Sequence, residues 1–185
     1  MKKVFAICGS TRKDSSNLQL LKAICELYKD QLQIEIYTQL AELPHFNPDV
    51  TEEQTPLIIQ QFRRKITDAD GVLICTPEYV FSLPGALKNA IEWTISTTVF
   101  SEKPVALITA SGLGQKAHES LLLIMKTIYS RYTENTQLCI SGARSKLAQN
   151  KITDPETLAR VCNLVSAFIE LMNEPSGDLH SPQVL

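Results

Sequence analysis

An unbroken apolar run near the start of the chain, Val4–Cys8, restricts the possible folds more than any other feature of the sequence. The run has the length of one strand and offers no polar face to water, so both of its faces must be covered. Residues 71–76 and 103–110 form two further runs of the same character. Strands of this kind are typical of a parallel sheet that has helices on both faces.

Helical patterns separate these strands. Apolar residues recur at spacings of three and four in residues 18–28, 56–66, 84–93, 118–130 and 154–172. A more exposed alternating strand at 33–37 and a weaker strand at 136–140 complete a set of five. Strands that alternate with helices predict an α/β fold, a doubly wound parallel sheet with right-handed crossovers.

The chain is expected to form one domain over residues 1–173, followed by a C-terminal tail, 174–185, which contains two prolines and a glycine. Residues 38–55 contain two prolines and no periodic pattern, so they predict a long loop. With 185 residues the chain is long enough to bury a core without disulfides or a metal.

Charge and cysteine usage exclude several classes of protein. The net charge is −2 and the longest cationic run is Arg63–Lys65, so no nucleic-acid partner is expected. The five cysteines are odd in number and widely spaced within apolar patterns, which favours a reduced, cytoplasmic protein.

The apolar run after Met1 is too short for a signal peptide, and no stretch approaches a membrane span. We expect no metal site and no catalytic thiol.

The residues after the first strand have the chemistry of an anion site. Gly9 ends the strand, and one guanidinium then stands among short hydroxyl and amide side chains before a helix begins. Unpaired N–H groups at a helix start, hydroxyl donors and an arginine fork together bind phosphate. Taken singly, Ser15 or Asn17 is also an ordinary helix cap. The residues concerned are Ser10, Thr11, Arg12, Ser15, Ser16 and Asn17.

Two loop motifs carry a specific resemblance. The pattern Gly9-Ser10-Thr11-Arg12-x-x-Ser15-x-Asn17 resembles the phosphate loop of the NADPH-dependent FMN reductase family. The segment from Thr76 to Trp93 is similar to the second signature of that family. The resemblance implies a flavodoxin-like three-layer sandwich with a five-stranded parallel sheet of order 2-1-3-4-5. It also implies bound FMN, NADPH or NADH as co-substrate, and a homodimer or homotetramer.

The resemblance also implies a set of cofactor-binding residues. The FMN phosphate would be held by Ser10, Arg12, Ser15 and Asn17, with Ser16 nearby. The isoalloxazine edge would be bordered by Pro77, Glu78, Tyr79 and Val80. The other side of the ring would be approached by Ser111 and Gly112. Family members often carry asparagine or histidine where this chain has Val80. Phe81 makes this part of the pocket more apolar, which favours an apolar or aromatic acceptor.

The function that this resemblance implies is an NAD(P)H-dependent reductase. Hydride would pass from nicotinamide to flavin N5 and then to a small-molecule acceptor such as a quinone, free flavin, azo compound or metal oxyanion. No catalytic side chain is required for this chemistry. No motif marks the nicotinamide site, for which Arg63, Arg64, Lys116 and Arg144 are available cations.

Two other classes of function compete with this one. An FMN electron carrier without nicotinamide activity would share the fold, but Arg12 in the loop and a pI of about 5.9 argue against it. A nucleotide-free signalling domain would need acidic residues at the strand ends. Cys8 and Cys75 occupy two of those positions instead.

Overall fold

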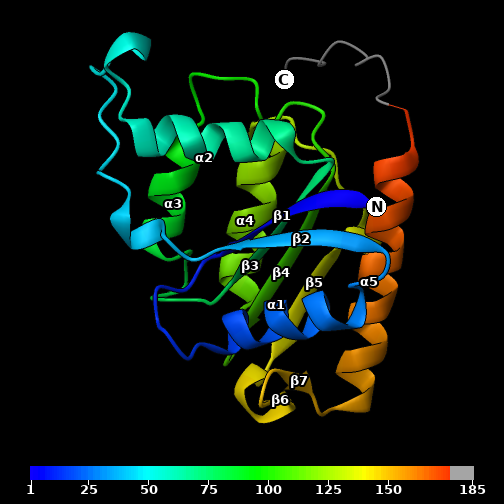
Figure 1. The fold of residues 1–185 in the computed structure, drawn as a ribbon. Helices are drawn as coiled ribbons and strands as arrows, with labels where there is room; N and C mark the ends of the chain where they lie inside the picture. The colour runs from blue at the N-terminus through cyan, green and yellow to red at the C-terminus, as the bar shows by residue number, and fades with distance from the viewer. Residues whose placement is uncertain (176–185) are drawn as a thin grey trace, which may run out of the picture.

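The computed structural model describes residues 1–175, and five parallel strands form its central sheet (Figure 1). The strands are β1 (Lys2–Cys8), β2 (Leu32–Tyr37), β3 (Gly71–Thr76), β4 (Val105–Ser111) and β5 (Gln137–Ser141). Their order is β2-β1-β3-β4-β5, with every neighbouring pair parallel. The predicted flavodoxin-like fold and strand order are confirmed. The predicted tail falls mostly on residues 176–185, which lie outside the described part of the chain.

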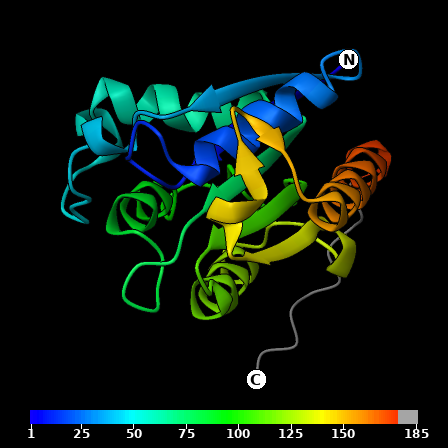
Figure 2. The ribbon, with the colours of Figure 1, turned by 90° about the horizontal axis from the view of Figure 1, so that it is seen from below.

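Five α-helices cover the two faces of the sheet (Figure 2). They are α1 (Ser16–Leu27), α2 (Leu57–Asp68), α3 (Gly85–Glu92), α4 (Gln115–Thr127) and α5 (Pro155–Asn173). Helices α1 and α5 pack on one face, against the side of β1 that presents Val4 and Ala6. Helices α2, α3 and α4 pack on the other, against Phe5 and Ile7. The apolar run of β1 is therefore buried from both sides, as its sequence requires.

The structure adds short elements that the sequence patterns did not predict. Two 3₁₀ helices, Leu40–Glu42 and Glu52–Gln54, lie within the expected loop 38–55. After β5 the chain forms a 3₁₀ helix, Ala143–Lys146, and a small antiparallel hairpin of β6 (Leu147–Ala148) and β7 (Lys151–Ile152). Another 3₁₀ helix, Glu134–Thr136, precedes β5. Each hairpin strand has two residues, too few for a periodic pattern.

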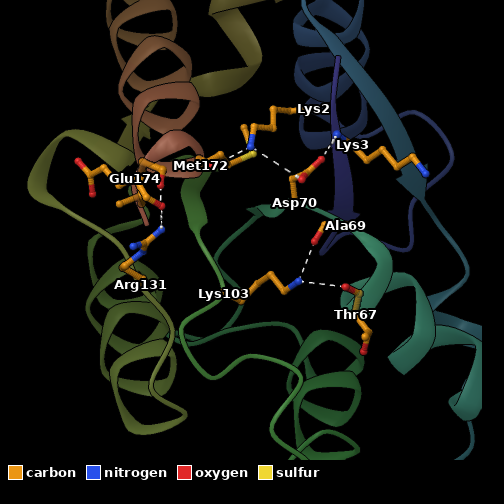
Figure 3. A network of polar contacts seen from close by, with 10 residues as sticks. Lys2, Lys3, Thr67, Ala69, Asp70, Lys103, Arg131, Met172 and Glu174 are labelled. Carbon is orange, nitrogen blue, oxygen red and sulfur yellow. Dashed lines mark hydrogen bonds and ion pairs between the residues drawn. The ribbon is translucent and has the colours of Figure 1, made fainter. Parts of the chain in front are cut away.

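A group of cations anchors the chain at the amino ends of the strands, opposite the loop that follows β1 (Figure 3). The Arg131 guanidinium donates to the carbonyls of Leu171 at 2.9 Å and Glu174 at 3.3 Å. Lys2 donates to the carbonyl of Met172 at 2.9 Å. These carbonyls end α5, where a helix leaves its last acceptors unpaired and carries partial negative charge. The two cations thus provide hydrogen-bond donors for carbonyls at the C-terminus of α5.

None of the helices in the described residues is long and apolar enough to cross a membrane.

We expect Arg131→Ala to lower the free energy of unfolding by about 1–3 kcal/mol, because several helix-terminal carbonyls lose a charged donor. Urea unfolding followed by circular dichroism measures this change. Lys22→Ala is a matched control, since Lys22 is an exposed cation of α1. Equal stability of the two variants would contradict the role given to Arg131.

Candidate functional site

The loops at the carboxyl ends of β1, β3, β4 and β5 surround one cleft of about 340 Å³. In an open parallel sheet this edge, where the strand order reverses, is the usual position of a ligand. The cleft brings together most of the residues that the sequence singled out. From those residues it is lined by Ser10, Arg12, Ser15, Ser16, Asn17, Pro77, Tyr79, Ser111 and Gly112.

The close approach of β1 and β3 fixes the start of the first loop. The Gly9 amide donates to the Cys75 carbonyl at 2.8 Å. A Cβ atom on Gly9 would lie 2.5 Å from the Thr76 hydroxyl oxygen, so a larger residue would push the two strand ends apart. The chain then turns into α1, whose N-cap is Ser15, with its Oγ accepting from the Leu18 amide at 3.1 Å. Of the two caps that the sequence allowed, the structure selects Ser15.

Asn17 lies on the first turn of α1 and is 3 % exposed. Its Nδ2 donates to the Ala110 carbonyl at 3.2 Å, and its Oδ1 accepts from the Cys75 thiol at 3.2 Å. Both ends of the amide are therefore occupied within the protein. The amide nitrogen carries a second N–H, so Asn17 can still donate to an anion beside the free N–H groups that begin α1.

Two arginines border the cleft. Arg12 comes from the loop after β1, and Arg144 comes from the 3₁₀ helix after β5. Both are exposed, and within residues 1–175 neither guanidinium takes part in an ion pair. No carboxylate of the described residues therefore lies within ion-pair distance of the two cations that border the cleft. From the sequence Arg144 is only an available cation, because its loop has no recognisable motif.

The loop after β3 forms a tight turn beside the cleft. The amides and carbonyls of Tyr79 and Ser82 bond to each other in both directions at 3.0 Å. Between them Val80 and Phe81 have φ angles of 50° and 57°, a left-handed conformation that β-branched and bulky residues adopt at a cost. Val80 is 97 % exposed and does not line the cleft. The Val80 side chain is therefore open to solvent beside the cleft.

Glu78 does not line the cleft either, and the same holds for Thr11, which the loop pattern offered as part of the anion site. The Glu78 Oε2 accepts a hydrogen bond from the Ala117 amide at 3.0 Å, in the first turn of α4. Gly114, with a φ of 91°, is the N-cap of this helix, which begins at Gln115, earlier than the predicted residue 118. A carboxylate at a helix start is stabilised by the partial positive charge there. Glu78 thus joins the strained turn at 79–82 to α4.

Two thiols lie beneath the first loop. Cys8 on β1 and Cys75 on β3 occupy neighbouring positions of the sheet, and both are free thiols. Their exposed fractions are 1 % and 0 %. Burial raises the pKa of the Cys8 thiol, and it raises the pKa of Cys75 well above the usual range. Both groups are therefore protonated near neutral pH, and the expectation of no catalytic thiol is consistent with their surroundings.

Arg63 corrects one sequence-based interpretation, because it is not an available cation. Its side chain is 8 % exposed and donates to the Trp93 carbonyl at 2.7 Å, to Glu52 at 2.8 Å and to Ser96 at 3.1 Å. The guanidinium ties the 38–55 segment to the end of α3. Trp93 is itself buried and donates from Nε1 to the Pro44 carbonyl at 2.7 Å.

We expect Glu78→Ala to destabilise the fold by about 0.5–2 kcal/mol, because the start of α4 loses its carboxylate cap. Glu78→Gln keeps an acceptor oxygen and should recover part of that loss. Thermal and urea unfolding of both variants provides the measurement. If the alanine variant were as stable as the parent, the bond from Ala117 would have no structural importance.

Fold and site together define a flavodoxin-like α/β domain with a cleft at the carboxyl ends of its strands. The chain belongs to the NADPH-dependent FMN reductase family, whose sequence profile matches residues 2–144. The family recognised from the two loop motifs is thereby confirmed.

Individual relatives agree with this assignment. An NAD(P)H:quinone oxidoreductase of Solanum tuberosum is 41 % identical over 115 residues, which are 60 % of this chain and 59 % of that protein. The NADH-dependent flavin reductase subunit 2 of Lactobacillus johnsonii is 30 % identical over 184 residues, which are 93 % of this chain and 98 % of that protein. The potato alignment therefore spans less than two thirds of its relative, whereas the bacterial one spans nearly all of it.

A solved structure matches most of the chain as well. The flavoenzyme NAD(P)H:(acceptor) oxidoreductase FerB of Paracoccus denitrificans superposes with a TM-score of 0.76 and 27 % identity, covering 93 % of this chain and 97 % of that one. These relatives are named as reductases or oxidoreductases, so the electron-carrier alternative is not favoured. The assignment of single residues to the flavin stays a prediction.

Proposed function

We propose that this protein is an NAD(P)H-dependent reductase that binds FMN in the cleft at the carboxyl ends of β1, β3, β4 and β5 and reduces a small-molecule acceptor. The observation that carries the proposal is the meeting of three predicted segments, 10–17, 77–79 and 111–112, around that cleft. Membership of the FMN reductase family supports the same cofactor.

The chemistry of the cleft fits FMN. Arg12 supplies a cation, and the start of α1 supplies N–H groups for the phosphate. The Ser10 Oγ accepts from the Arg12 amide at 3.3 Å, which leaves its hydroxyl proton free to donate to an anion. Pro77, Tyr79 and Gly112 offer flat apolar surface and backbone groups for the ring.

Bound FMN would supply hydride acceptance, so the protein need only position and shield the reactants. In this proposal the 10–17 loop fixes the phosphate end. The segments at 77–79 and 111–112 hold the ring and exclude water from it. Glu78 acts as a positioning residue, since its bond to Ala117 fixes the turn that borders the ring.

Exposed apolar side chains support an apolar, planar acceptor such as a quinone. Tyr79 is 45 % exposed, Phe81 is 70 % exposed and Leu113 is 66 % exposed, all in loops that border the cleft. Relatives named as quinone reductases point to the same class of acceptor. Either NADH or NADPH would serve as the electron donor.

The visible spectrum of purified protein mixed with FMN tests this function. We expect bound flavin whose absorbance bleaches after anaerobic addition of NADPH or NADH. Arg12→Ala should weaken FMN binding about 10-fold or more, because a charged donor to the phosphate is lost. Lys13→Ala removes the same charge from the next, exposed residue and should bind normally. Protein that binds no flavin would refute the proposal, and bound flavin that stays oxidised would indicate an electron carrier.

We also propose that the protein is a cytoplasmic homodimer, alone or as half of a homotetramer. Val80 and Phe81 stand exposed on one turn, and a second copy would remove them from water. The five cysteines are free, as in proteins of a reducing compartment. Light scattering after gel filtration should give a dimer or tetramer mass, and Phe81→Glu should reduce it to that of a monomer. A monomeric parent protein at tens of micromolar would exclude this assembly.

A further inference from the structure

The loop after β5 is a fourth wall of the cleft that no sequence motif indicated. Gly142, Ala143, Arg144 and Ser145 all line it. Hydrogen bonds hold this loop against the loop after β4. The Gly142 amide donates to the Gly112 carbonyl at 3.0 Å, and the Ser141 hydroxyl donates to the Leu113 carbonyl at 2.8 Å. The β5 loop therefore has a defined position relative to the rest of the site.

Arg144 lies where two pockets adjoin. It lines the cleft and also a neighbouring pocket of about 280 Å³, and Arg12 and Ser16 line both as well. The two arginines are far apart in the sequence, yet they border the same pair of cavities beside the start of α1. Ser16 is the first residue of α1, so this shared border is also the helix N-terminus.

Neither arginine forms an ion pair within the described residues. Asp14 lines the neighbouring pocket, but no carboxylate oxygen in residues 1–175 lies within ion-pair distance of either guanidinium. Two cations that border one cavity, together with the helix N-terminus beside it, make the electrostatic potential in that cavity positive. An anion bound there would relieve the repulsion between them.

We propose that Arg144 is a second phosphate-binding arginine, which holds the flavin phosphate together with Arg12. The inference rests on the proposed function, because it assigns a further residue to the same FMN site. A phosphate monoester carries close to two negative charges at pH 7, and two arginines match that charge. The planar fork of each guanidinium also suits phosphate oxygens better than a lysine ammonium does.

A second arginine makes the site selective for the doubly charged phosphate. The second pKa of a phosphate monoester is about 6, so FMN binding should weaken as the pH falls below that value. Riboflavin has no phosphate, and its binding should not follow this titration. The loop after β5 is hydrogen-bonded to Gly112 and Leu113 in the loop after β4. An anion bound to Arg144 would therefore also help to hold the loop after β4 beside the flavin ring.

Titration of the parent protein and three variants with FMN and with riboflavin tests the proposal, with flavin fluorescence as the readout. Arg144→Ala should weaken FMN binding about 10- to 100-fold, since a charged hydrogen-bond donor is lost. Its affinity for riboflavin should stay within about twofold of the parent value, and its FMN affinity should depend less on salt. Arg144→Lys should recover part of the loss. Lys151→Ala is the matched control, because it removes an exposed cation from β7 that lines neither pocket.

The outcomes separate this inference from the function on which it rests. Parent protein that binds no FMN would overturn the proposed function and the inference with it. Parent protein that binds FMN while Arg144→Ala binds it equally well would overturn the inference alone. An equal loss of FMN and riboflavin binding in Arg144→Ala would show that the residue only supports the loop, which also overturns it. A loss confined to FMN supports the proposal.

Discussion

The buried amide of Asn17 joins the start of α1 to the carboxyl ends of two strands, and the shape of the cleft depends on this connection. Its two hydrogen bonds reach the Ala110 carbonyl on β4 and the Cys75 thiol on β3. Removing the amide would leave the Ala110 carbonyl without this buried partner, which is costly. The first loop is therefore held in place by the protein itself, and a ligand in the cleft need not supply the energy to order it.

The two edges of the sheet have opposite electrostatic roles. Helices in a parallel α/β fold run against the strands, so their N-termini gather at the carboxyl edge and their C-termini at the amino edge. At the carboxyl edge the start of α1 borders the cleft, and the start of α4 binds the Glu78 carboxylate. At the amino edge Arg131 and Lys2 complete the end of α5. One arrangement of helix dipoles thus serves both the site and the stability of the fold.

The sequence was most informative where burial is continuous and least informative where a contact joins distant residues. Runs such as Val4–Cys8 predicted the strands, and the loop pattern from Gly9 predicted the family. Arg63 looked exposed because its partners Trp93 and Glu52 come from other segments. The position of Arg144 likewise depends on a short helix with no periodic signal. Long-range contacts of this kind leave no trace in local sequence spacing.

The protonated thiols beneath the first loop have a consequence for the proposed substrates. Quinones are electrophiles, and the species that they alkylate is the thiolate. Cys8 and Cys75 are closed to solvent, and burial keeps both in the neutral form. A reductase with exposed, ionised cysteines near its cleft would be inactivated by its own acceptor. With a quinone as acceptor, the packing that anchors the loop would therefore also protect these two thiols from alkylation.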